Sequence, residues 1–344
     1  MKQILREAFD HPDRGGIFYS ADGVVPKSRR LSGLKQWDWT PSKVHRVEGV
    51  TTCFFPLALG CKPTRTSQGT PWIEKMIRDP AQVLDLIPPK INGEFAGEIL
   101  RRASKLVEDL PPDGQIRILD VQSPLGVAEL MWDHSFYFAL VEHPDAVHEL
   151  LGKITRFIID FVKAFQQIAG ARLNPCGFPK LWSDGPGTMV ADDTMSLVSP
   201  EMHREFSVPY LNQLAAECGP LYYHSCTWRA PYFDNIRQIK NVRAYNWNPG
   251  NSDDPAVLNR AFGGKALLVP HLVIDGHCEP DALKHSVKYA DEFEFFKHQV
   301  ESAPKNVAQY FWFSNICEKG AIMEKIYDYL HARGHTPAAH GLDS

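Results

Sequence analysis

Short runs of apolar, β-branched or aromatic residues alternate with longer segments of helical period from about residue 116 onward. A short apolar run is typical of a buried strand, and apolar residues spaced three to four apart are typical of an amphipathic helix. Their regular alternation predicts βαβ units around a parallel sheet. The predicted strands span 116–121, 180–184, 220–226, 242–246, 265–271 and 307–314, with two earlier strands near Val47 and Cys53.

The helices between these strands carry start and stop signals. The longest begins at Pro144 and keeps its apolar stripe until Gly170. Two more begin where a capping residue, Ser199 or Asp254, precedes a proline, because proline is preorganised for the first helical turn. A last helix begins near Lys319. Helices therefore separate the strands at regular intervals.

Several predicted strands carry polar or reactive side chains only at their carboxyl ends. In a (β/α)8 barrel the apolar body of each strand fills the interior, whereas its last residue and the following loop form the active site. We therefore predict an α/β fold, a single (β/α)8 TIM barrel over residues 46–335, with an N-terminal helix-and-loop extension over 1–45 and a tail over 336–344. The polar ends are Trp182-Ser183-Asp184, His224-Ser225-Cys226, Asn246-Trp247-Asn248, His271 and Asn315-Ile316-Cys317.

Composition excludes several classes of function. The 344 residues carry a net charge of -4, so no basic field exists for nucleic acid or an anionic membrane surface. The longest uncharged stretch, 49–61, is shorter than the roughly 20 apolar residues that span a bilayer. The first ten residues, MKQILREAFD, contain no apolar export signal. We expect a cytoplasmic, globular enzyme without nucleic-acid or membrane partners.

The cysteines point away from a disulfide framework. Seven are scattered along the chain without a CxxC pair, which favours reduced thiols or a metal site.

Two of these residues belong to a candidate metal site. His224 and Cys226 are two positions apart at a strand end, so both side chains point to the same side. An imidazole nitrogen and a thiolate suit Zn²⁺, which is commonly held by three protein ligands when it is catalytic. Cys317, at the end of the last predicted strand, reaches the same rim if the barrel closes. The alternative is that His224 is a hydrogen-bonded barrel residue and both cysteines are small buried hydrophobes.

Residues 116–317 resemble the uroporphyrinogen decarboxylase superfamily, in particular its corrinoid-protein methyltransferase branch. The matching stretches are ILDVQSPLGVAELMW, HPDAVHELLGKITRFIIDFVKAF, LWSDGPGTMVADDTMSLVSPEMHREFSVPYL and LYYHSCTW, followed by the late Cys317. The resemblance implies a (β/α)8 barrel in which His224, Cys226 and Cys317 bind zinc for methyl transfer. The chain has no DxHxxG motif, so the cobalamin is expected on a separate corrinoid protein.

The chain departs from the family pattern at several positions. The arginine-rich signature of true uroporphyrinogen decarboxylases is not recognisable, which disfavours tetrapyrrole decarboxylation. Asn246 and Asn248 stand where related methionine synthases offer a glutamate ligand. The zinc then has three protein ligands and an open position, or Glu279 or His271 completes it.

Acidic and imidazole side chains at strand ends are candidates for proton transfer. Asp184 is the first choice for a general acid or for substrate orientation, because desolvation at an aromatic-lined mouth raises the pKa of a carboxyl group. His271 ranks second, as a group that polarises substrate or binds metal. Asp192 and Asp193 are alternatives, although turn or helix-start roles suit them better.

Aromatic residues near the strand ends predict an apolar pocket for a small, flat substrate. Trp182, Tyr223 and Trp228 are expected to line it, and Asn246 to orient the substrate, for example a methoxylated aromatic.

The leading hypothesis is a zinc-dependent methyltransferase. It moves a methyl group from a small methylated compound to a corrinoid protein, or from that protein to a thiol. The alternatives are a uroporphyrinogen-decarboxylase-like decarboxylase and a non-catalytic barrel that binds a metal or a corrinoid protein.

Overall fold

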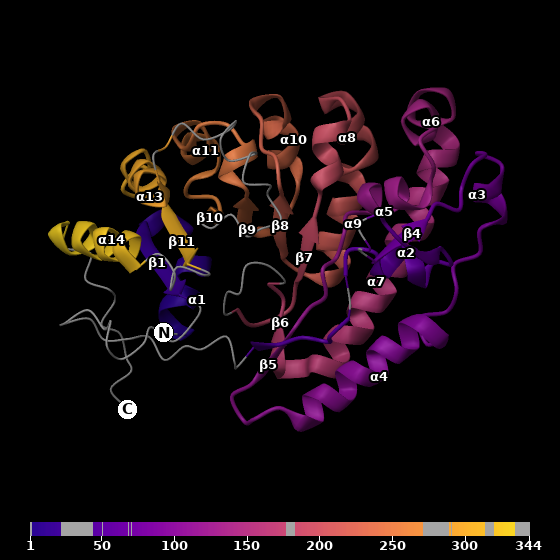
Figure 1. Ribbon diagram of the computed structural model, residues 1–344, viewed down its shortest axis with the longest axis horizontal. Helices are drawn as coiled ribbons and strands as arrows, with labels where there is room; N and C mark the ends of the chain where they lie inside the picture. Colours follow the sequence, from indigo (N-terminus) through magenta and orange to yellow (C-terminus); the bar gives the residue numbers. More distant parts are fainter. Residues whose placement is uncertain are drawn as a thin grey trace.

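The fold is that of a computed structural model (Figure 1), which describes residues 2–21, 44–49, 51–67, 69, 71–176, 183–270, 289, 291–313 and 320–333. The strands lie side by side in the middle of the molecule, and helices cover their outer side. Among the described residues, no helix combines the length and apolar character needed to cross a membrane.

The largest sheet is parallel and follows the order expected of a barrel wall. Its order is β1-β11-β10-β9-β8-β7, so successive strands are neighbours and the first strand pairs with the last. A chain that winds around a closed wall brings its ends together in this way. The strands are β1 (Gly16–Ala21), β7 (Thr188–Ala191), β8 (Leu221–Ser225), β9 (Val242–Trp247), β10 (Leu267–Pro270) and β11 (Ala308–Phe313).

A second parallel group extends the wall beyond β7. Here β5 (Gln115–Arg117) lies between β2 (Val44–His45) and β6 (Leu173–Asn174). The chain after β5 then runs beside β7, with a parallel bridge between Gln122 and Ala191. Strand β6 pairs with β5, and strand β7 pairs with the residues that follow β5. Both strands are therefore neighbours of the same stretch of chain. Among the described residues, a six-stranded and a three-stranded parallel group joined by this bridge, with helices outside them, agree with the predicted α/β barrel.

The helices form the outer layer. The longest, α7, buries one apolar stripe, and burial of each such side chain contributes roughly 1.5–3 kcal/mol. The helices are α1 (Lys2–Asp10), α2 (Phe54–Ala58), α3 (Gln82–Asp85), α4 (Glu94–Asp109), α5 (Pro124–Met131), α6 (Phe136–Glu142), α7 (Pro144–Ala169), α8 (Pro200–Phe206), α9 (Val208–Cys218), α10 (Phe233–Gln238), α11 (Pro255–Phe262), α13 (Glu292–Glu301) and α14 (Gly320–Ala332). A short hairpin joins β3 (Lys62–Arg65) to β4 (Pro71–Glu74).

The predicted helix starts are confirmed by their caps. The Ser199 hydroxyl accepts a hydrogen bond from the Met202 amide at 3.2 Å, at the start of α8. The Asp254 carboxylate accepts one from the Ala256 amide at 2.8 Å, at the start of α11. Each cap satisfies a backbone N–H that has no partner inside its helix.

Three predictions need correction. Of the strand predicted at 180–184, Ser183 and Asp184 are not in a strand, and 180–182 lie outside the described residues. The wall strand β7 begins at Thr188, after two glycines in the left-handed region, Gly185 and Gly187. The strand predicted near Cys53 is helix α2, whose apolar residues pack against the outer layer. The segment expected to be only helix and loop contains β1, which pairs with β11 over six positions.

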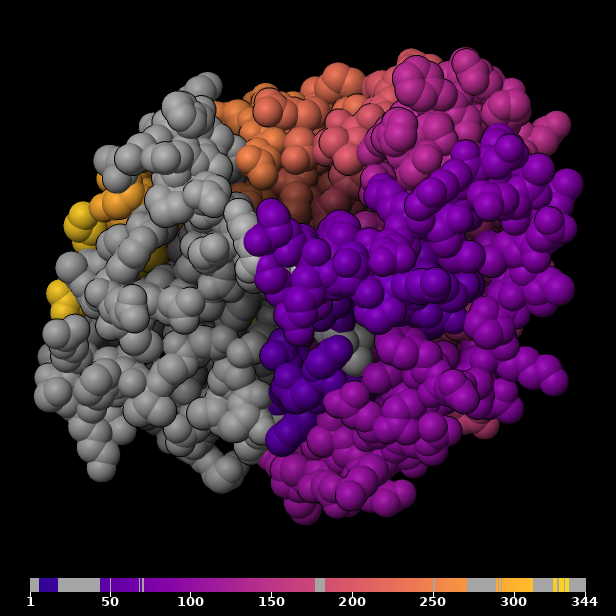
Figure 2. Space-filling model, turned by 45° about the vertical axis from the view of Figure 1, so that its right-hand side comes forward, coloured from indigo at the N-terminus to yellow at the C-terminus, as the bar shows by residue number. Residues whose placement is uncertain are grey.

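Segments from the first third of the chain, coloured indigo to purple, occupy the right-hand part of the face shown in Figure 2. Along the top of that view they meet the helices from the middle of the chain, which follow the carboxyl ends of the wall strands. Strands β7, β8 and β9 are parallel neighbours, so their carboxyl ends lie at the same end of the wall. This is the end at which a (β/α)8 barrel has its active site.

Candidate metal centre

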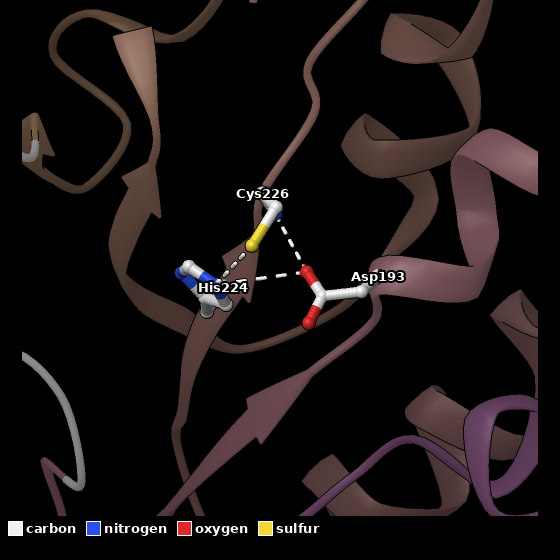
Figure 3. A group of neighbouring side chains, drawn as sticks. All are labelled: Asp193, His224 and Cys226. Atoms are coloured by element: carbon white, nitrogen blue, oxygen red, sulfur yellow. Dashed lines mark hydrogen bonds and ion pairs between the residues drawn. The ribbon is translucent and has the colours of Figure 1, made fainter. Parts of the chain in front are cut away.

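Three metal-binding side chains converge at the carboxyl ends of β7 and β8. Asp193, His224 and Cys226 each offer one ligand atom, and these atoms lie within 4.8 Å of one another. The Nε2 atom of His224 is 3.5 Å from the Cys226 sulfur and 3.6 Å from Asp193 Oδ1. Figure 3 shows the three side chains pointing toward one another from the two strand ends.

The register of the sheet produces this arrangement. Ala191, the last residue of β7, pairs with His224. Asp193 begins the short 3-10 helix after β7, and Cys226 directly follows β8, so both residues lie just beyond the strand ends, close to His224. The Cys226 amide donates to Asp193 Oδ1 at 2.6 Å, which turns the carboxylate toward the other two side chains.

The cluster lies at the boundary between core and solvent. The His224 side chain is 9% exposed, whereas the Asp193 side chain is 42% exposed. A nitrogen, a sulfur and a carboxylate oxygen form a donor set that zinc accepts, and the exposed side leaves room for a further ligand.

Of the sequence-predicted metal ligands, the structure brings His224 and Cys226 together. Cys317 lies outside the described residues, as do Glu279 and His271, the expected alternatives for a further ligand. Asp193 joins the cluster instead of serving only as a turn residue. From the sequence it was considered only as an alternative for proton transfer, because a turn or helix-start role suited it better.

A further acidic residue close enough to interact electrostatically with His224 and Asp193, Asp120, was missed by the sequence analysis. It follows β5 at the same end of the wall, where its carboxylate accepts hydrogen bonds from Gln122 Nε2 at 3.0 Å and Thr52 Oγ1 at 3.3 Å. Burial raises the pKa of Asp120, and the nearby Asp193 carboxylate raises it further. The signal was present in the sequence, because Asp120 is the acidic residue at the end of a predicted strand.

Asp184 lies at the opposite end of the wall. It precedes β7, and its carboxylate forms an ion pair with Arg6 of helix α1. Its backbone carbonyl accepts a hydrogen bond from Arg243, at the start of β9. The structure therefore separates Asp184 from the cluster, because the strand that was expected to end at this residue does not include it.

Asp192 is turned away from the cluster and is fully buried. Its Oδ2 atom accepts hydrogen bonds from His203 Nε2, Ser207 Oγ and the Tyr223 hydroxyl, at 2.9, 3.0 and 3.1 Å. Burial alone would raise the pKa of Asp192, but the interactions with His203 outweigh it and hold the pKa below its usual range.

The aromatic residues predicted to bind substrate are placed differently from one another. The Tyr223 hydroxyl is engaged by Asp192, and burial raises the pKa of that hydroxyl well above its usual value. Trp228 is fully buried and packs against Trp247 and Phe262. Trp182 lies outside the described residues. Asn246 contacts His224, with 2.5 Å between its Oδ1 and the histidine Nδ1.

Comparison with known proteins places this geometry in a family. The family model of uroporphyrinogen decarboxylase (URO-D) matches residues 52–288. The structure is similar to that of a methyltransferase from Methanosarcina mazei, with a TM-score of 0.59 and 15% sequence identity over 83% of this chain and 80% of that chain. Comparison with curated protein sequences gives no significant match. The family match includes strands β5 to β10 and the three residues of the cluster, and it confirms the resemblance read from the sequence: the chain belongs to the uroporphyrinogen decarboxylase (URO-D) family.

Proposed function

We propose that this protein is a zinc-dependent methyltransferase of the URO-D family. It transfers a methyl group between a small methylated compound and the cobalt of a corrinoid carried by a separate protein. The observation that carries the proposal is the convergence of Asp193, His224 and Cys226 at the carboxyl ends of the strands. The structural similarity to a methyltransferase supports it.

The side chains fit a zinc ion in spacing as well as in chemistry. Ligands bonded at about 2.0–2.3 Å to a tetrahedral ion stand about 3.3–3.8 Å from one another. The His224 nitrogen is separated from the Cys226 sulfur by 3.5 Å and from the Asp193 oxygen by 3.6 Å. Both distances from His224 suit a shared ion, and all three ligand atoms lie within 4.8 Å of one another. The family resemblance adds Cys317 as a proposed ligand, and the ion would then bind substrate by expanding from four to five ligands.

The proposed reaction assigns separate roles to the zinc ion, to the polar residues beside the cluster and to the exposed side of the cluster. When bound, zinc polarises the heteroatom that carries the methyl group, or it lowers the pKa of a thiol acceptor. Asp120 and Gln122 lie beside the cluster and are placed to orient the substrate's polar atoms. The more exposed Asp193 side is where a substrate can approach.

Metal analysis and methyl transfer together test the proposal. We expect about one zinc per chain, loss of the metal in His224→Gln and Cys226→Ser, and methylation of cob(I)alamin by the wild type with a methoxylated aromatic donor. Reduced cobalamin tests the chemistry without the partner protein. A metal-free preparation with full methyl-transfer activity would overturn the zinc mechanism.

A second candidate function is decarboxylation, which the match to the uroporphyrinogen decarboxylase model favours. That reaction would use the barrel without the metal. The same metal-depleted protein, assayed for loss of carboxyl groups from a tetrapyrrole carboxylate, distinguishes the two. A decarboxylation rate that does not change when a chelator removes the metal would support the decarboxylase.

A further inference from the structure

Asn246 lies directly beside His224 on the next strand of the wall. The register of β8 and β9 pairs the two residues, and both are at least nine-tenths buried. On one side, Asn246 Oδ1 is 2.5 Å from His224 Nδ1. On the other side, Asn246 Nδ2 donates to the Val269 carbonyl of β10 at 2.6 Å. One amide therefore links the candidate ligand to two further strands.

These two contacts define which imidazole nitrogen carries the proton. The Val269 carbonyl can only accept, so the amide nitrogen of Asn246 must face it. The amide oxygen then faces His224 and can only accept as well, so His224 Nδ1 must donate. In a neutral imidazole the lone pair is then on Nε2. That is the atom nearest to Asp193 and Cys226.

We infer that Asn246 is a positioning residue that holds His224 in the Nδ1–H tautomer and presents the Nε2 lone pair to the cluster. Rotating the amide by half a turn would set its oxygen against the Val269 carbonyl, and two acceptors facing each other in a buried site repel one another. Since both polar ends of Asn246 are engaged by the protein, this role replaces the substrate contact expected from the sequence.

The inference rests on the proposed function only for the identity of the ion, because the tautomer is a property of the metal-free chain. Groups that hold the second nitrogen of a metal-binding histidine typically change metal affinity by 10- to 100-fold when they are removed. Asn246 is therefore expected to influence zinc binding without contacting zinc.

Nitrogen NMR of the metal-free protein tests the tautomer directly. With ¹⁵N-labelled histidine at pH 8, the His224 signals are identified by their absence in His224→Gln. We expect a protonated Nδ1 and an unprotonated Nε2 in the wild type. Asn246→Leu, which has a similar volume and no polar atoms, should lose this preference. Asn246→Asp, which keeps the acceptor, should retain it.

Metal affinity provides the second measurement. Zinc competition with a chromophoric chelator should show about 10- to 100-fold weaker binding for Asn246→Leu and less than about tenfold for Asn246→Asp. The matched control is Asn259→Leu, because Asn259 is also a buried asparagine with two side-chain partners, Gln299 and Ser302. The control should lose stability but keep both the His224 tautomer and the zinc affinity.

The outcomes separate the inference from the proposed function. An unchanged His224 tautomer in Asn246→Leu, or equal defects in Asn246→Leu and Asn246→Asp, would overturn the positioning role. If the wild type binds no zinc but the tautomer still depends on Asn246, the positioning role stands and the zinc-dependent function fails.

Discussion

Two neighbouring carboxylates, Asp192 and Asp193, lie on opposite sides of the barrel wall and have opposite surroundings. Asp192 is fully buried between the sheet and helices α8 and α9, where three side chains donate to one of its oxygens. Asp193 is 42% exposed and accepts from the Cys226 amide beside the metal-binding side chains.

The difference between the two follows from the turn after β7. The chain leaves the strand at Asp192, which contacts Ser207 and His203, and begins a short 3-10 helix at Asp193, which contacts Cys226. The buried carboxylate has its Oδ2 atom occupied by three protein donors, so this residue stabilises the fold. The exposed one has oxygen capacity left for a ligand. Asp192 and Asp193 are the same residue type. What distinguishes the proposed structural role from the proposed ligand role is how deeply each carboxylate is buried and how many protein donors it accepts from.

The largest expected effect is on the buried side. Asp192→Ala leaves His203, Ser207 and Tyr223 without their acceptor, and breaking such a buried charged network typically costs about 3–5 kcal/mol. Urea unfolding of the metal-free protein measures the loss. A change below about 1 kcal/mol would mean that the network contributes little, and the contrast with Asp193 would disappear.

The exposed side should show the reverse behaviour. Asp193→Ala removes a carboxylate that contributes one ligand atom, so we expect zinc affinity to fall by at least about tenfold while the unfolding free energy changes by less than about 1 kcal/mol. Chelator competition and urea unfolding on the same preparations provide both numbers. Unaltered zinc affinity would exclude Asp193 as a ligand.

The contribution of Asp192 to stability should depend on pH. The folded pKa of Asp192 is lowered, so its ionised form stabilises the fold above the unfolded value of about 3.9, and this contribution is lost as the pH falls through the folded value. The stability difference between the wild type and Asp192→Asn should be full at pH 6 and shrink toward pH 3. A difference that is constant across this range would contradict the assignment.

Asp120 should respond to pH with the opposite sign. Burial, together with Asp193, raises its folded pKa, so its contribution to stability is present below about pH 4 and is lost as the pH rises through the folded value. Without zinc, Asp120→Asn should therefore become more stable relative to the wild type between pH 4 and pH 8. Urea unfolding at several pH values measures this trend, and a trend in the other direction would place Asp120 in a solvated site.

The elements that could be predicted are those whose signals are local. Helix α8 and helix α11 begin at their caps, and strands β8 to β11 follow apolar runs. Strand β7 was misplaced because two apolar segments, one around 180 and one at 188–191, both fit a strand. The glycines between them are visible in the sequence, but their left-handed backbone conformation is known only from the structure.

The site was predictable to the same extent. His224 and Cys226 are two residues apart, so their shared direction follows from one strand. Asp193 and Asp120 come from neighbouring segments, and their approach depends on the register between strands, which a single sequence does not specify. The role of Asn246 depends on both neighbours of its strand. Pairing across strands is therefore what the structure adds.

The smallest effect is expected at the far end of the wall, where Asp184 provides a matched control for Asp193. The Asp184 side chain is 27% exposed and that of its partner Arg6 is 55% exposed, and ion pairs of this kind typically contribute less than about 1 kcal/mol. Because Asp184 is separated from the cluster by the length of β7, Asp184→Asn should keep zinc affinity and methyl-transfer rate within about twofold of the wild type. Measuring kcat and zinc affinity for Asp184→Asn and Asp193→Asn side by side tests the assignment of the active-site end. A large rate loss at Asp184 with intact zinc binding would restore it as the proton donor and place the reaction at the other end of the wall.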